Sequence, residues 1–208
     1  MVESQEGLKR DSGPPYGAVW RVTNPLDKTT WNNISDQIVE SDDYETKITI
    51  GRGKILIDHL KSNYRNKLDI ADISEDWSTI TNRRTVYQTP TTGPYGWKVY
   101  PSATICGDYI WTGDASYDSA ANRITLKLLR VNLNNFSDVV EFDTWSFTNP
   151  GGGETHIHSF CLFHKYVMYQ WGNTPRVGRL SIYDLNGNKL WEVDPFRWHF
   201  TFHNIHYS

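Results

Sequence analysis

Cysteine is scarce in this sequence, with only Cys106 and Cys161 among 208 residues. Two cysteines are too few for the disulfide framework of a small secreted domain. They occupy nearby positions in two similar segments, so a bridge between them is conceivable. Both fall inside apolar runs typical of strands, however, and we expect two buried free thiols. Stability must then come from an apolar core, which a chain of this length can build.

Long hydrophobic runs and a charge excess of one sign are also missing. No segment approaches the roughly 20 consecutive apolar residues of a transmembrane helix, and residues 1–15 contain no apolar signal-peptide core. We therefore predict no membrane span and assign no compartment. Basic residues number 21 against 24 acidic ones, for a net charge of -3. Nucleic-acid-binding domains usually carry a strongly basic face, so we expect no nucleic-acid partner.

Aromatic residues, by contrast, make up 14% of the chain, with 9 Trp and 12 Tyr. This composition, together with many glycines and asparagines, is typical of strands and turns and predicts an all-β fold. The clearest pattern lies between residues 155 and 195, where Asn186-Gly187-Asn188 separates two alternating apolar runs as in a β-hairpin. Four successive strands are predicted there, at 156–163, 166–171, 178–185 and 190–193.

This four-strand unit recurs along the chain. A hairpin at 18–22 and 30–34 comes first, and residues 199–208 resemble the first half of a unit. The spacing of about 40 to 60 residues is that of propeller blades. The two complete copies are predicted at 46–50, 55–60, 68–73 and 84–88, and at 103–106, 109–112, 124–133 and 139–142.

The units resemble the blades of β-propeller repeat proteins. Residues 181–193, SIYDLNGNKLWEV, are similar to the quinoprotein-like and YncE-like group, where a strand ending in Asp-Leu precedes a Gly/Asn turn and a Trp-containing strand. The resemblance implies a small propeller of about four four-stranded antiparallel blades, one of them built from both chain termini to hide free strand edges. Two alternatives stay open, namely a larger ring shared by two chains and a fragment of a larger propeller.

The implied domain organisation follows the repeats. A flexible N-terminal arm is expected over 1–15, and the propeller over 16–208. Within the propeller we expect half-blades at 16–40 and 198–208 and blades at 44–90, 98–145 and 154–195.

Histidines gather late in the chain, six of the seven after residue 155. His156 and His158 are two residues apart on a predicted strand and therefore face the same way, and His199 and His203 could do the same. Imidazoles suit Zn, Fe or Cu, so these four residues are the candidate metal ligands. The alternative, which we favour, is that they pack between blades or hydrogen-bond within the channel, with no cofactor.

Aromatic side chains provide the other candidate site. Tyr95, Trp97 and Trp198 lie in or beside predicted loops, where large rigid side chains can contact a partner. Tryptophans inside predicted strands are instead expected to fill the spaces between blades; these are Trp20, Trp111, Trp171 and Trp191.

Together these patterns predict a binding or assembly module rather than an enzyme. We expect the loop faces of the blades to bind a protein or glycan partner, as part of a viral or cell-surface assembly or as a homo-oligomer. The alternative is a metal-dependent enzyme with a histidine-lined central channel.

Overall fold

The computed structural model describes residues 2–4, 19–22, 26–27, 29, 31–61, 66–75, 78–89, 99–151, 154–174 and 177–194. These residues form β-strands and the short 3-10 helix η2 (Ser35–Gln37), and no α-helix occurs among them. The all-β prediction is therefore confirmed. The chain divides into two compact units, residues 1–92 and residues 93–208, which are described separately below.

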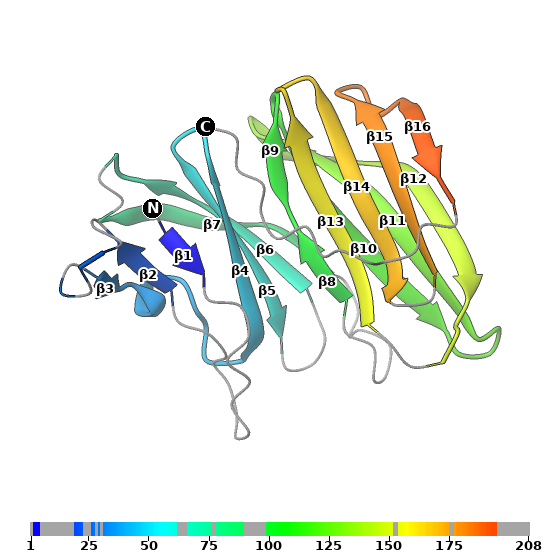
Figure 1. The fold of residues 1–208 in the computed structure, drawn as a ribbon, viewed down its shortest axis with the longest axis horizontal. Helices are drawn as coiled ribbons and strands as arrows, with labels where there is room; N and C mark the ends of the chain where they lie inside the picture. The colour runs from blue at the N-terminus through cyan, green and yellow to red at the C-terminus, as the bar shows by residue number, and fades with distance from the viewer. Residues whose placement is uncertain are drawn as a thin grey trace. The chain divides into compact units, whose positions relative to one another are not determined.

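Unit 1 contains one of the three predicted four-stranded antiparallel sheets (Figure 1). A smaller sheet precedes it, in which β2 (Val19–Val22) and β3 (Trp31–Asn33) form the predicted hairpin. Strand β1 (Val2–Ser4) pairs with β2, although it falls in the segment expected to be an arm. The large sheet has the order β4 (Asp43–Gly51), β5 (Lys54–Lys61), β6 (Asn66–Ile73) and β7 (Ile80–Gln88).

An apolar core lies on one face of the β4–β7 sheet. Alternation along β5 directs Ile55 and Ile57 to this face, because successive side chains of a strand point to opposite sides. Ile34 and Ile38, on either side of η2, are buried in the same cluster. The segment around η2 therefore covers this face of the sheet.

Unit 2 contains the other two predicted sheets (Figure 1). The first has the order β12 (Asn135–Thr148), β11 (Arg123–Asn132), β10 (Tyr109–Asp118) and β9 (Thr104–Cys106). The second has the order β16 (Lys189–Val193), β15 (Val177–Asp184), β14 (Tyr166–Thr174), β13 (Glu154–Leu162) and β8 (Val99–Ser102). Strand β8 was not predicted, and it pairs with β13 in parallel.

The core of unit 2 lies between its two sheets. Trp111 and Leu126 enter it from the β9–β12 sheet, and Trp171 and Tyr169 enter it from the β13–β16 sheet. All four side chains are fully buried. Burial of Trp111 and Trp171 agrees with the sequence prediction, but Trp191 was wrongly expected to be buried, since it is 48% exposed on the edge strand β16.

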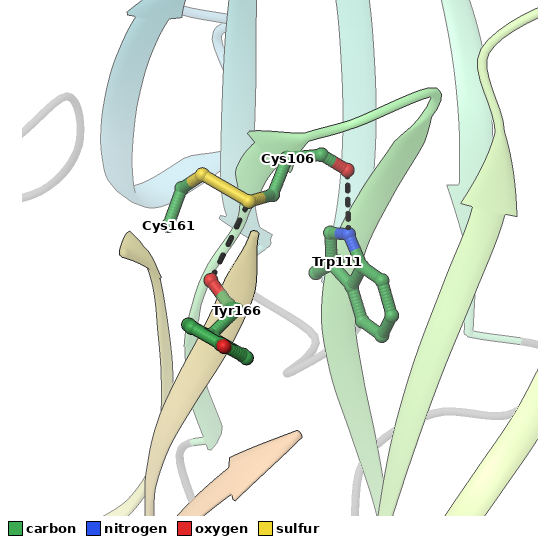
Figure 2. The surroundings of a disulfide bond; sticks show 4 residues. All are labelled: Cys106, Trp111, Cys161 and Tyr166. Carbon is green, nitrogen blue, oxygen red and sulfur yellow. Dashed lines mark hydrogen bonds between the residues drawn. A yellow bond between two sulfur atoms is a disulfide. The ribbon is translucent and has the colours of Figure 1, made fainter. Parts of the chain in front are cut away.

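A disulfide joins Cys106 of β9 to Cys161 of β13 (Figure 2). The expectation of two free thiols was therefore wrong. The packing of the sheets brings the two Cα atoms to 5.3 Å, within the range that a disulfide spans. The indole Nε1 of Trp111 donates a hydrogen bond to the carbonyl oxygen of Cys106, and Sγ of Cys106 lies 3.5 Å from the carbonyl oxygen of Tyr166. These contacts tie the ends of β9, β13 and β14 together.

Candidate functional site

Two of the four predicted metal ligands come together on β13. Atom Nε2 of His158 lies 3.2 Å from Nδ1 of His156, and the two rings stack with their centroids 5.2 Å apart. Their common orientation confirms the prediction from strand periodicity. His199 and His203 lie outside the residues that the structure describes.

The predicted aromatic binding residues Tyr95, Trp97 and Trp198 also lie outside the described residues. Within the described part of the chain, large apolar side chains are exposed at other positions. The most exposed aromatic ring is that of Phe163, at 80%, and Tyr166 nearby is 40% exposed. The remaining exposed large apolar side chains are Leu26, Val139, Leu190 and Trp191.

Phe163 lies in the tight turn between β13 and β14. The amide of Lys165 donates a hydrogen bond to the carbonyl oxygen of Leu162, which closes the turn, and Phe163 and His164 occupy its two central positions. Both have positive φ, 53° and 55°. These φ signs are those of the two central residues of a type I′ turn, where asparagine and glycine are favoured and a phenylalanine is strained, and Lys165 completes the three-residue connection between Leu162 and Tyr166.

The turns between the first two strands of the β4–β7 sheet and of the β9–β12 sheet do contain glycine. Arg52 and Gly53 join β4 to β5 with φ values of 54° and 68°, and Gly107 joins β9 to β10 with a φ of 62°. A bulky residue held at positive φ costs about 1 to 3 kcal/mol. The β13–β14 turn therefore combines an unfavourable backbone conformation with an exposed phenyl ring at a single residue.

The base of this turn is rigidly held. Cys161, two residues before Phe163, carries the disulfide to Cys106. Tyr166, which follows the turn, pairs with Leu162 across the hairpin. Phe163 thus projects from a short turn whose flanking strands are held by a disulfide and by strand pairing, and not from a long loop.

Unit 1 contains a second candidate, a cluster of charged side chains that the sequence analysis did not predict. It lies on the face of the β4–β7 sheet that carries Ile55 and Ile57, farther along β5, where His59 and Lys61 continue the same alternation. The cluster consists of Glu40, Asp42, Asp43, His59, Lys61, Lys67, Asp69 and Arg83.

His59 is at the centre of the cluster and is completely buried. Its Nδ1 lies 2.6 Å from Oδ2 of Asp43, and its Nε2 lies 3.5 Å from Oδ2 of Asp69 and 2.9 Å from Nη2 of Arg83. Burial alone would lower the pKa of His59, but the hydrogen bonds to Asp43 and Asp69 outweigh it and raise this pKa. Arginine can only donate, so Nε2 accepts from Arg83 in the neutral imidazole and donates to Asp69 in the imidazolium.

Glu40 connects the segment after η2 to the sheet. Its Oε1 lies 2.6 Å from Nζ of Lys67 and 2.7 Å from Nη2 of Arg83, and its Oε2 contacts Nζ of Lys61. Nζ of Lys61 also lies 2.7 Å from Oδ1 of Asp43. Burial would raise the pKa of Asp43, but hydrogen bonds from His59 and Lys61 hold this pKa at about 2.

Glu40, Asp43 and His59 could in principle hold a metal ion, since one ligand atom of each lies within 4.8 Å of the others. The surrounding cations do not fit that role. Lys61 contacts both carboxylates, and Arg83 contacts Glu40 and His59. The negative charge that would attract an ion is therefore already neutralised, and the arrangement is a structural ion-pair network.

Comparison with known proteins adds no family to these observations. No family model matches the sequence, and no curated protein matches it. Among the described residues, none of the helical segments has the length and apolar character to cross a membrane.

Proposed function

We propose that this chain is a binding module that presents the β13–β14 turn to a protein partner, on sheets that are blades of a small propeller. The observation that carries the proposal is Phe163, which is 80% exposed and has a φ of 53°. Either property alone is unfavourable for phenylalanine. Asparagine or glycine would satisfy the turn without exposing an apolar ring, so a contact made by the ring itself accounts for its presence.

A protein partner fits this surface better than a glycan. Sites for small ligands such as glycans are concave, whereas a phenyl ring that projects from a hairpin tip suits insertion into an apolar pocket of a partner. His164 and Lys165, which follow Phe163 in the turn, are both exposed. The ammonium group of Lys165 would complement an acidic rim around such a pocket.

The disulfide supports the placement of this module in an extracellular or cell-surface assembly. Disulfides persist mainly in oxidising compartments. The Cys106–Cys161 bond also keeps the hairpin preorganised, which lowers the entropy lost when a partner binds.

The test is a quantitative affinity enrichment with three baits, from extracts of the cells that produce the protein. The baits are the wild-type chain, Phe163→Ala, and Leu190→Ala as a matched control at another exposed apolar residue, 54% exposed on β16. We expect a partner whose affinity falls by about 30-fold for Phe163→Ala, as for an interface hot spot, and is unchanged for the control.

Equal retention of every bound protein by the wild-type and Phe163→Ala baits would reject the proposal. Circular dichroism of each bait confirms that the fold is intact. Sedimentation of the wild-type chain at two concentrations tests whether the partner is a second copy, in which case Phe163→Ala remains monomeric.

A further inference from the structure

We infer that His156 and His158 form a chelating site for a divalent ion of the Zn²⁺ class on the half-buried face of β13. This inference is independent of the proposed function. It rests on the geometry of two imidazoles whose nitrogens, Nδ1 of His156 and Nε2 of His158, lie 3.2 Å apart.

That separation matches the geometry of metal ligands. Two imidazole nitrogens bound to one tetrahedral Zn²⁺, each at 2.0 to 2.1 Å, lie about 3.3 Å from each other. The planes of the two rings are inclined by only 28°. Rotation about the bond that joins a histidine ring to its Cβ is soft, so small rotations can direct both lone pairs to a common point.

Strand periodicity keeps the two rings on this face. Thr155, Ile157 and Ser159 alternate with the histidines and are buried on the opposite face, toward the core of unit 2. The histidines themselves are half-buried, so a small hydrated ion can reach them. Two protein ligands leave further positions on the ion for water or another ligand, as in open metal sites.

The protons can be accommodated without any redox step. A hydrogen bond across the 3.2 Å between the two nitrogens requires that one of them carries a proton and that the other accepts the hydrogen bond. On metal binding, that proton moves to the far nitrogen of its own ring by tautomer exchange, and both near nitrogens become ligands. Both rings must be neutral to bind the ion. The affinity for the ion should therefore decrease when the pH drops below about 6.5, the ordinary pKa of histidine.

This pair differs from His59 in its access to solvent. Around His59 the neighbouring carboxylates are neutralised by Lys61 and Arg83, and the side chain is completely buried. At His156 and His158 the two facing nitrogens lie 3.2 Å apart on a half-buried surface. Imidazoles with this access select borderline ions such as Zn²⁺ over Mg²⁺.

The first experiment is isothermal titration of the full chain with ZnCl2 at pH 7.5, with MgCl2 for comparison. The variants are His156→Gln and His158→Gln, and the matched control is His164→Asn, which removes an exposed imidazole from the same hairpin. Asparagine tolerates the positive φ of residue 164. We expect the wild-type chain to bind one Zn²⁺. Each glutamine variant should lose at least about 100-fold in affinity for Zn²⁺, which is more than the loss of a residue that only contacts a metal ligand usually causes. The His164→Asn control should bind Zn²⁺ as the wild-type chain does.

A second measurement uses only the wild-type chain, so it does not depend on the variants folding. Long-range ¹H–¹⁵N spectra of the histidine rings report the state of each nitrogen, and Zn²⁺ should shift Nδ1 of His156 and Nε2 of His158. The inference fails if the wild-type chain shows no Zn²⁺ binding, if Zn²⁺ shifts other histidines and leaves these two unchanged, or if both glutamine variants retain the affinity.

Discussion

Nδ1 of His59 lies 2.6 Å from Oδ2 of Asp43, and neither side chain is exposed to solvent. The two residues belong to neighbouring strands, β5 and β4, and His59 also faces Asp69 of β6. A protonated His59 balances the charge of the cluster, because four carboxylates then face three basic side chains and one imidazolium. The cluster fastens the segment around η2 to the β4–β7 sheet through Glu40 and through Arg83, which donates to the carbonyl oxygen of Gln37.

Replacement of His59 by leucine should strongly destabilise unit 1. The variant leaves the buried carboxylates of Asp43 and Asp69 without their shared partner, and breaking a buried pair in this way costs about 3 to 5 kcal/mol. The free energy of unfolding in urea, followed by circular dichroism, measures the loss. His164→Asn is the control and should change it by less than about 0.5 kcal/mol. A loss below about 1 kcal/mol for His59→Leu would mean that the network contributes little.

The same network predicts a stability maximum on the acidic side of neutrality. Because the pKa of His59 is raised by folding, its contribution is complete below its unfolded pKa of about 6.5 and is lost as the pH rises through its folded pKa. The pKa of Asp43 is lowered to about 2, so its contribution is complete above about pH 4 and is lost as the pH falls toward 2. Stability from this pair should therefore be greatest between these limits.

Unfolding free energies measured from pH 3 to pH 9 test this dependence. His59→Gln should abolish the decline on the alkaline side, since glutamine does not titrate. If the wild-type protein gains stability from pH 6 to pH 8 and the variant follows the same curve, the assigned protonation of His59 is wrong.

Loss of the disulfide should weaken unit 2 without changing its fold. The bond links residues 55 positions apart, and removal of such a cross-link typically costs about 2 to 4 kcal/mol. We expect this drop in the unfolding free energy for Cys106→Ala/Cys161→Ala and for the reduced wild-type protein. Reductant should have no effect on the double variant. A wild-type protein equally stable with and without reductant would contradict the bond's contribution.

The β13–β14 turn should be easy to stabilise at the expense of binding. Phe163→Asn/His164→Gly introduces the residues that a type I′ turn prefers, and relief of the strain at Phe163 should add about 1 kcal/mol to stability. Thermal unfolding measures the gain, and the affinity for the partner proposed above should fall at the same time. Unchanged or lower stability would show that the positive φ of Phe163 is not strained.

The sequence alone determined the class of the fold and most of its strands. The predicted strand at 55–60 corresponds to β5, and the predicted turn at Asn186-Gly187-Asn188 lies between β15 and β16. Both signals are local, because side chains alternate with a period of two and tight turns require particular residues. The common orientation of His156 and His158 follows from the same periodicity.

The ends of strands and the parallel pairing of β8 with β13 were less predictable. Strand β12 continues to Thr148, whereas its apolar pattern suggested an end at residue 142. Its later residues are held by pairing with β11, where Ile124 faces Phe147. Strand β8 similarly depends on β13, a strand more than 50 residues away, for its hydrogen bonds.

Only the tertiary structure decided which distant side chains meet. Cys106 and Cys161 become bonded because two sheets pack together, and Glu40 reaches Lys61, Lys67 and Arg83 because the segment around η2 covers the β4–β7 sheet. The alternation of His59 and Lys61 after Ile55 and Ile57 is visible in the sequence, but the partners on other strands are not. Periodicity assigns a side chain to a face, whereas register between strands and packing between layers assign its neighbours.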